Sequence, residues 1–166
     1  MTGYIITDRR TGLGDSLLNL CACWYLAKRY KRQVIIDWRR LPYNLKETEN
    51  STRHEVNLFH SLFSCPPQMQ GVHFLFPENF DKISFGPKTK DGYPFDLDHL
   101  PLISQEASSF ASVDGVLKNN KARFVRCDMR MGQKNACFSR LRTINSSNFN
   151  YWFFINSLPL CIPVKD

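Results

Sequence analysis

Gly12-Leu13-Gly14-Asp15 decides the fold of this chain, because it joins an apolar segment to an amphipathic one. Residues 4–7 before it are apolar, residues 16–30 after it have helical spacing, and residues 33–38 form a second apolar segment. Strand, glycine turn, helix and strand make a βαβ unit, which begins a parallel sheet. The turn then lies at the carboxyl edge of the sheet, where such sheets bind ligands. We therefore expect an α/β fold, a Rossmann-like parallel sheet with flanking helices.

The helix after the turn has the clearest pattern in the chain. Its apolar residues recur at intervals of three and four, which places them on one helical face; they are Leu17, Leu20, Cys21, Trp24 and Ala27. Asp15 or Thr11 is expected to cap its first amides. The cations of residues 28–32 suit its carboxyl end, where the helix dipole is negative.

The second strand runs into Asp37-Trp38-Arg39-Arg40, which places two arginines at the same sheet edge as the glycine turn. Farther along, a capping box at residues 52–55 predicts a short helix that continues to residue 63. The remaining pattern predicts strands at 72–76, 82–85 and 123–127, helices at 104–117 and 135–141, and a long loop at 86–102.

The charge of the chain points to an anionic ligand only weakly. The net charge is +7 over 166 residues, and its excess concentrates near the end of the first helix and the second strand. That concentration is either a solvated helix end or a basic rim on a binding cleft. Its members are Lys28, Arg29, Lys31, Arg32, Arg39 and Arg40.

The cysteines and the termini indicate a compartment. The 6 cysteines match no zinc pattern, and several have apolar neighbours, as buried free thiols do. We therefore expect no disulfide framework and a reducing environment. No leader is recognisable at the N-terminus, and the longest apolar run, residues 151–164, is too short for a bilayer. These features predict a cytoplasmic protein without a transmembrane segment.

The glycine turn has two interpretations. Free amides at a helix start suit phosphate, but this G-x-G lacks the third glycine of the dinucleotide fingerprint and the lysine of a P-loop. Asp15 also competes with phosphate for those amides. The alternative is a tight βα turn without a ligand. Asp96-Leu97-Asp98 has the D-x-D pattern of a metal-assisted site, yet such pairs are common by chance, and the histidines lack ligand spacing. We expect no metal.

The residues of this opening resemble a known family. Gly12-Leu13-Gly14-Asp15-Ser16-Leu17, Ala27-Lys28-Arg29 and Val34-Ile35-Ile36-Asp37-Trp38-Arg39 are similar to the start of the nodulation fucosyltransferases (NodZ-type). Weaker likenesses follow at residues 57–63, 71–72, 83–87 and 125–128. The resemblance therefore covers residues 3–145 in patches.

The resemblance implies a glycosyltransferase of the GT-B type, with two Rossmann-like domains facing each other across a cleft. It implies GDP-fucose as donor, an oligosaccharide acceptor such as a chitin fragment, inversion at the sugar carbon, and no required metal. Residues 1–145 would be the N-terminal, acceptor-side domain, and residues 146–166 an aromatic tail that begins a truncated second domain. Such a tail favours self-association only where it is left exposed. The expected substrate-binding residues are Gly12, Gly14, Asp15, Arg39 and Arg40.

The chain departs from that family at one motif. The family's H-x-R, whose arginine neutralises the donor diphosphate, does not occur, because no His here is followed two positions later by Arg. Fixed charges of this kind usually supply the largest catalytic contribution. We therefore expect this chain alone to be inactive or weakly active, to bind GDP-fucose weakly or not at all, and to lack the catalytic base.

Two other functions compete with this interpretation. One is a non-catalytic module that binds a glycan or a protein and derives from a truncated glycosyltransferase. The other is a basic nucleic-acid binder, but scattered acids and the lack of a stripe of aromatic and basic residues argue against it.

Overall fold

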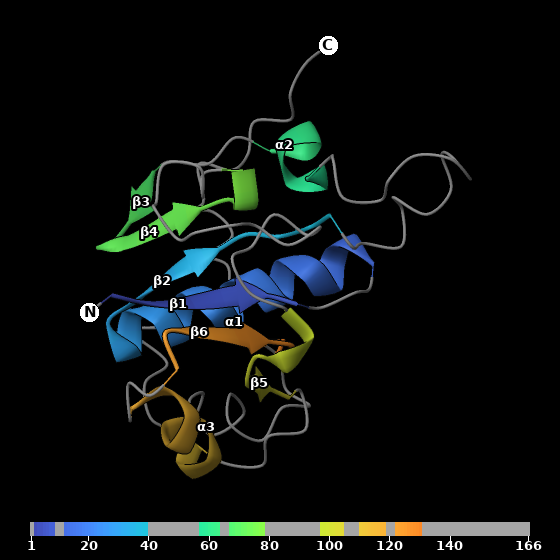
Figure 1. Cartoon of the computed structure of the whole chain (residues 1–166). Coiled ribbons are helices and arrows are strands. Elements are labelled where there is room, and N and C mark those ends of the chain that lie inside the picture. Colours follow the sequence, from blue (N-terminus) through green and yellow to red (C-terminus); the bar gives the residue numbers. More distant parts are fainter. Residues whose placement is uncertain are drawn as a thin grey trace, which may run out of the picture.

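The computed structural model describes residues 2–8, 12–39, 57–63, 67–78, 97–104, 110–118 and 122–130. Within them a 6-stranded sheet has the order β3-β4-β2-β1-β6-β5 (Figure 1). Every neighbouring pair is parallel except β3 and β4, which are antiparallel. The predicted Rossmann-like parallel sheet is therefore confirmed. The strands are β1 (Gly3–Thr7), β2 (Arg32–Ile35), β3 (Gln68–Met69), β4 (Val72–Leu75), β5 (Leu102–Ile103) and β6 (Phe124–Cys127).

The α-helices among the described residues share one face of the sheet. They are α1 (Leu13–Tyr30), α2 (Leu58–Leu62) and α3 (Phe110–Leu117). The chain steps in the same direction across the sheet from β1 to β2, from β2 to β4 and from β5 to β6. Right-handed crossovers in one direction place their connections on one face. Side chains of all three helices accordingly join a single core cluster with inward residues of the sheet, such as Ile5, Val34 and Val125.

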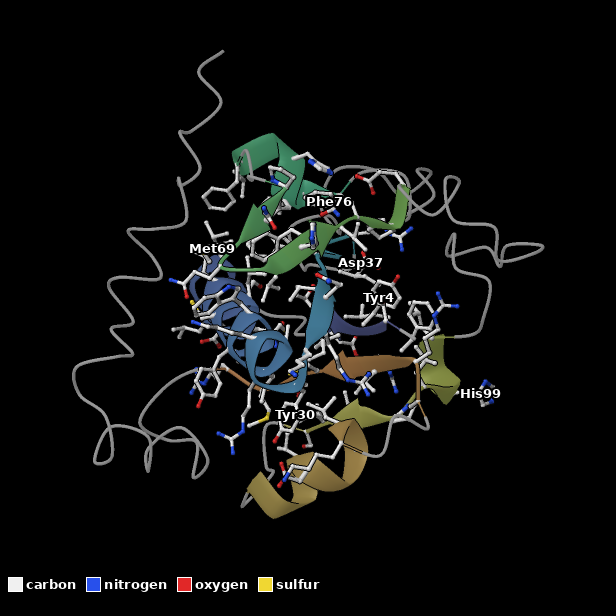
Figure 2. All side chains as sticks on the ribbon, turned by 90° about the vertical axis from the view of Figure 1, so that its left-hand side faces the viewer. Tyr4, Tyr30, Asp37, Met69, Phe76 and His99 are labelled. Atoms are coloured by element: carbon white, nitrogen blue, oxygen red, sulfur yellow. The ribbon has the colours of Figure 1, made fainter. Side chains whose placement is uncertain are left out.

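The opposite face carries a smaller core. Tyr4 stacks on Phe124 with ring centroids 4.9 Å apart, and both pack with Ile6. The 3-10 turn η3 (Leu97–His99) covers this cluster through Leu97, which is 3% exposed. Tyr4 and His99 accordingly lie on the side of the sheet away from α1 (Figure 2). The chain thus crosses to this face between β4 and β5.

Helix α1 begins without a side-chain cap, so the predicted capping by Asp15 is wrong. Its N-cap is Gly12, whose carbonyl accepts bonds from the Ser16 amide at 3.0 Å and the Ser16 hydroxyl at 3.1 Å. Asp15 lies inside the first turn, whereas a capping side chain must sit at the N-cap itself. The second predicted cap, Thr11, is outside the described residues. The helix ends at Lys31, which is left-handed (φ 54).

The predicted cluster of cations divides between the two edges of the sheet. Lys28, Arg29 and Lys31 are exposed at the end of α1. Arg32 is 2% exposed at the start of β2 and donates to the carbonyls of Leu117 and Ala122, both at 3.0 Å. Arg39 lies beyond the far end of β2, and Arg40 is outside the described residues. The described cations therefore do not form one basic rim.

Several predicted boundaries move. Helix α2 begins at Leu58 rather than in the capping box, and its cap is Asn57, whose side chain accepts from the Phe59 amide at 3.2 Å. Ser104 lies outside any helix, so the predicted helix at 104–117 starts too early. The loop predicted at 86–102 contains η3 and reaches β5, because elements of two or three residues have no period to detect. The strands at 72–76 and 123–127 are confirmed to within one residue.

Other predicted features lie outside the described residues. These are the capping box at 52–55, the strand at 82–85, the helix at 135–141, the aromatic tail at 146–166 and Asp96 of the D-x-D. No described helix has the length and apolar character needed to cross a membrane.

Candidate functional site at the carboxyl edge

The parallel strands β1, β2 and β6 end together beside the start of α1 (Figure 1). We call this region the carboxyl edge; it comprises Asp8 and residues 12–15, 37–39 and 128–130. Two contacts draw it together. The Asp8 amide donates to the Cys127 carbonyl at 3.0 Å, and the Asp37 amide donates to the Thr7 hydroxyl at 2.9 Å. The end of β1 therefore contacts the segments that follow β2 and β6, and the glycine turn and the end of the second strand lie at the same edge of the sheet, as the sequence predicts.

The predicted site glycines leave space rather than make an unusual turn. Gly12 has φ −58 and ψ 161, which any residue adopts. Gly14 is helical, and a Cβ on it would meet nothing within 4 Å. Both residues are exposed. Their backbone does not require glycine, so the feature that distinguishes this turn is its open surface at the start of α1.

Asp15, the third predicted residue, is paired with a residue that the sequence did not single out. Its Oδ1 accepts from Nη1 of Arg130 at 2.6 Å, and the two side chains are 29% and 28% exposed. The carboxylate therefore occupies the positive end of the helix dipole. A second pair follows at the end of β1, where Arg126 lies 3.4 Å from Asp8 and also donates to the Leu100 carbonyl.

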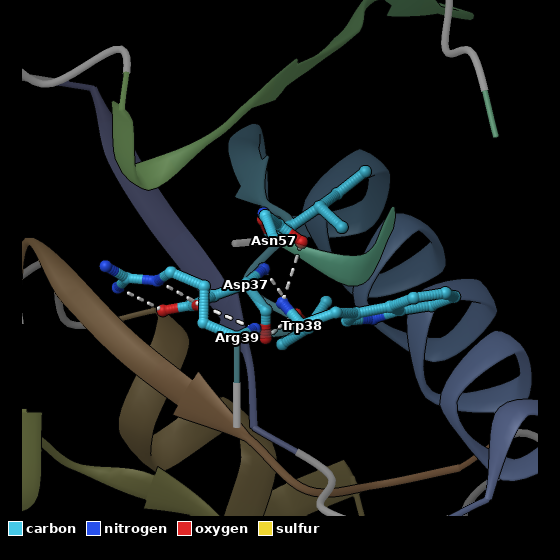
Figure 3. Close-up of polar contacts among 6 residues, drawn as sticks. Asp37, Trp38, Arg39 and Asn57 are labelled. Carbon is cyan, nitrogen blue, oxygen red and sulfur yellow. Dashed lines mark hydrogen bonds and ion pairs between the residues drawn. The ribbon is translucent and has the colours of Figure 1, made fainter. Parts of the chain in front are cut away.

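Arg39, the fourth predicted residue, is 7% exposed and bound to Asp37 (Figure 3). Its Nε and Nη2 each donate to the Asp37 carboxylate at 2.8 Å, which is the bidentate geometry of a strong arginine–carboxylate pair. The pair stiffens the end of β2. Arg40 was also predicted, and no geometry is described for it.

Asn57 fastens the same strand end to α2 (Figure 3). Its Oδ1 accepts from the Trp38 amide at 3.2 Å, and its Nδ2 donates to the Ile36 carbonyl at 2.8 Å. Trp38 is thereby held against the ring of Phe59, with centroids 5.2 Å apart. One buried amide group thus fixes both the cap of α2 and the path of the chain after β2.

Asn19 does the equivalent for the end of β6. It is 1% exposed on α1, and its Nδ2 donates to the carbonyls of Cys127 at 2.9 Å and Met129 at 2.6 Å. These bonds hold the chain on both sides of Asp128. Arg130 follows directly and reaches Asp15.

The thiols near this edge are not nucleophiles. Cys21, Cys23 and Cys127 are free and buried. Burial raises the pKa of Cys21 and of Cys23 well above the usual value, and for Cys23 a hydrogen bond with Cys127 raises it further. A reactive cysteine needs a lowered pKa and access to solvent. Among the described residues, no group of His, Cys, Asp and Glu side chains is arranged to hold a metal ion.

Sequence reasoning missed Asn19, Arg126 and Arg130. Asn19 breaks an otherwise apolar stretch of α1, and a polar residue at a buried position needs partners. Arg130 follows the predicted strand at 123–127, and the carboxyl ends of parallel strands meet at one edge. Both clues are present in the sequence, but the partners could be named only once the strand order was known.

These features define the class of the protein: a Rossmann-like α/β domain whose polar side chains gather at the carboxyl edge. The family model described as Nodulation protein Z (NodZ) matches residues 2–90, and the chain belongs to that family. The matched region includes the glycine turn, β2 and Asn57. It does not include β6 or Arg130.

Curated relatives are similar over part of their length. Nodulation protein Z of Sinorhizobium fredii is 33% identical over 85 residues, which are 51% of this chain and 24% of that protein. Nodulation protein Z of Azorhizobium caulinodans is 37% identical over 68 residues, which are 41% of this chain and 19% of that protein. The chain thus matches about a quarter or less of the length of these relatives.

Solved NodZ structures match a larger share of this chain than the curated relatives do, at lower sequence identity. The fucosyltransferase NodZ from Bradyrhizobium is 25% identical with a TM-score of 0.48, over 87% of this chain and 49% of that one. A NodZ alpha-1,6-fucosyltransferase co-crystallised with GDP is 26% identical with a TM-score of 0.48, over 87% and 50%. The fold is assigned from the strand order of this chain itself.

Proposed function

We propose that this chain is the acceptor-side domain of a fucosyltransferase-like glycosyltransferase of the GT-B type. In the complete reaction, fucose passes from GDP-fucose to an oligosaccharide acceptor. Membership in the NodZ family carries this proposal. The contact between the end of β1 and the end of β2 supports it, because these strand ends and the glycine turn lie within the matched residues and at one edge of the sheet.

The proposed substrate-binding residues are Gly12, Gly14, Asp15, Arg39 and Arg40. The two glycines leave the start of α1 open to a sugar, and Asp15 accepts a bond from a sugar hydroxyl. Arg39 shapes the site through its bidentate pair with Asp37 rather than by reaching outward. Arg40 binds anionic or hydroxyl groups of the substrate.

The donor diphosphate is proposed to bind outside this edge. A leaving GDP carries concentrated charge, which cations must stabilise. The three arginines described near this edge each face a carboxylate, in the pairs Arg39–Asp37, Arg126–Asp8 and Arg130–Asp15. An arginine already neutralised in this way stabilises a diphosphate less. This arrangement suits a neutral acceptor sugar.

We extend the proposal to the organisation of the chain. Residues 1–145 are one domain and residues 146–166 an aromatic tail. Catalysis needs no metal. The protein acts in the cytoplasm, and the free thiols of Cys21, Cys23 and Cys127 support this location.

A non-catalytic glycan-binding module remains the second candidate, and the charge-balanced edge favours it equally.

Calorimetry of the 166-residue chain with GDP-fucose tests the acceptor-side assignment. We expect a Kd no tighter than about 1 mM, which is about −4 kcal/mol. Micromolar binding of GDP-fucose would show that the chain holds a donor site and would contradict the proposal. Chitotetraose in a parallel titration is expected to bind.

Sedimentation at several concentrations separates the two candidates. A binding module that works through its aromatic tail associates with itself as the concentration rises. The acceptor-side domain stays monomeric over the same range. A matched chain ending at residue 145 controls for association through other surfaces.

A further inference from the structure

Asn19, a buried side chain of α1, helps to hold the turn out of β6. The Nδ2 group of Asn19 donates hydrogen bonds to the carbonyls of Cys127 and Met129, which flank Asp128. A buried amide left without partners is costly, so the folded chain retains these bonds. Together with the bond from the Asp128 amide to the Ile103 carbonyl of β5, 2.9 Å long, they fix the path on which the chain leaves β6.

That path brings Arg130 to the first turn of α1. Its Nη1 is 2.6 Å from Oδ1 of Asp15, and more than a quarter of each side chain is exposed. A donor and an acceptor are therefore presented side by side at the open surface left by Gly14. Asn19, 1% exposed, lies beneath this pair and does not itself reach solvent.

The chemistry of the pair fits two neighbouring hydroxyls. One hydroxyl donates to the Asp15 carboxylate while the next accepts from the Arg130 guanidinium. An anion fits less well, because the Asp15 carboxylate already occupies the positive end of the helix dipole. A pyranose ring carries such neighbouring hydroxyls without net charge.

We propose that Asp15 and Arg130 together bind a vicinal diol of the acceptor sugar, and that Asn19 is the positioning residue that sets Arg130 in place. This inference rests on the acceptor-side function proposed above. It adds a part of the chain that the family match at residues 2–90 does not cover.

The test measures the affinity of the full chain for chitotetraose by NMR titration. We expect Arg130→Gln to weaken binding roughly ten- to a hundredfold, because it removes a hydrogen bond that a charged group donates to the sugar. Arg130→Lys, which keeps the charge without the planar fork, is expected to restore part of the affinity. Lys118→Gln is the matched control: it removes a cation 2.6 Å from Asp114 on α3 and should bind like the wild type.

A double-mutant cycle separates positioning by Asn19 from a general structural role. If Asn19 acts through Arg130, then Asn19→Ala weakens binding, and the double variant binds no more weakly than Arg130→Gln alone. Additive losses would contradict the positioning role. If Asn19→Ala does not fold, Arg130→Gln still decides the diol site, because its side chain is partly exposed and its loss leaves the Asn19 bonds intact.

Each result has a distinct meaning. Wild-type affinity in Arg130→Gln overturns this inference and leaves the proposed function standing. A wild-type chain that does not bind chitotetraose contradicts the acceptor-side function and this inference together. Inorganic pyrophosphate that competes with chitotetraose at micromolar concentration would show an anion site and overturn the choice of a neutral ligand.

Discussion

At the scale of single residues, Gly3 and Arg32 depend on one another. They are opposite each other in the parallel register of β1 and β2. A Cβ on Gly3 would lie 2.7 Å from Nη1 and 2.9 Å from Cζ of Arg32. The guanidinium uses that space to reach the carbonyls of Leu117 and Ala122, which joins β2 to the end of α3 and the start of β6. Burial lowers the pKa of Arg32, because the charged group is shielded from water.

We predict that Gly3→Ala destabilises the fold. The new methyl group displaces the Arg32 guanidinium from its carbonyl partners, which costs about 1–3 kcal/mol. Urea unfolding measures the change. Gly115→Ala is the control, because a Cβ there meets nothing within 4 Å and alanine favours a helix by about 1 kcal/mol. Equal stability of the two variants would contradict the role assigned to Gly3.

Tyr30 gives a prediction about pH. Burial, and then the hydrogen bond it donates to Asp114, raise the pKa of Tyr30 from 10.0 to about 12. The folded chain therefore holds the phenol proton more tightly than the unfolded chain does. The resulting stability is fully present below pH 10 and is lost as the pH rises toward 12.

Unfolding of the wild type and of Tyr30→Phe across that interval measures this contribution. We expect the wild type to lose more free energy of unfolding than the variant between pH 10 and 12. Parallel curves would mean that the Tyr30 phenol titrates alike in both states.

At the scale of elements, tertiary contacts set the boundaries that local patterns missed. A capping box predicted the start of α2, but Asn57 caps it because the same side chain also binds the chain after β2. The helix α1 and the strands β4 and β6 were predictable, since their apolar periods are long or their ends are marked. The short β5 and η3 were not, because each depends on a neighbour rather than on its own residues.

We predict that Asn57→Ala destabilises the fold more than loss of a helix cap alone. A cap contributes about 1 kcal/mol, and the Trp38 amide and Ile36 carbonyl would also lose their partner, at about 1–3 kcal/mol for each buried group. Asn57→Asp keeps both accepted bonds, so its stability should lie between those of the wild type and Asn57→Ala. Chemical unfolding, followed by tryptophan fluorescence, ranks the three proteins. An alanine variant as stable as the wild type would contradict the role assigned to Asn57.

At the scale of the whole molecule, the strand order places the site. Three crossovers in one direction gather the helices on one face, and the carboxyl ends of β1, β2 and β6 then meet beside α1. The sequence alone was enough to predict that Gly12, Gly14, Asp15 and Arg39 lie at this edge. It could not supply Arg130 or Asn19, because their partners lie more than a hundred residues away along the chain. It also could not reveal that Arg39 is buried on Asp37.

The central claim is that the carboxyl edge receives a neutral acceptor sugar and not the nucleotide donor. The most direct measurement follows the amide resonances of the chain during parallel titrations with chitotetraose and GDP-fucose. Chitotetraose should shift Gly14, Asp15 and Arg130 and leave Lys31 and Lys118 at the opposite edge unchanged, while GDP-fucose shifts none of them. A carboxyl edge that is silent toward chitotetraose, or that saturates with GDP-fucose at micromolar concentration, would contradict the claim.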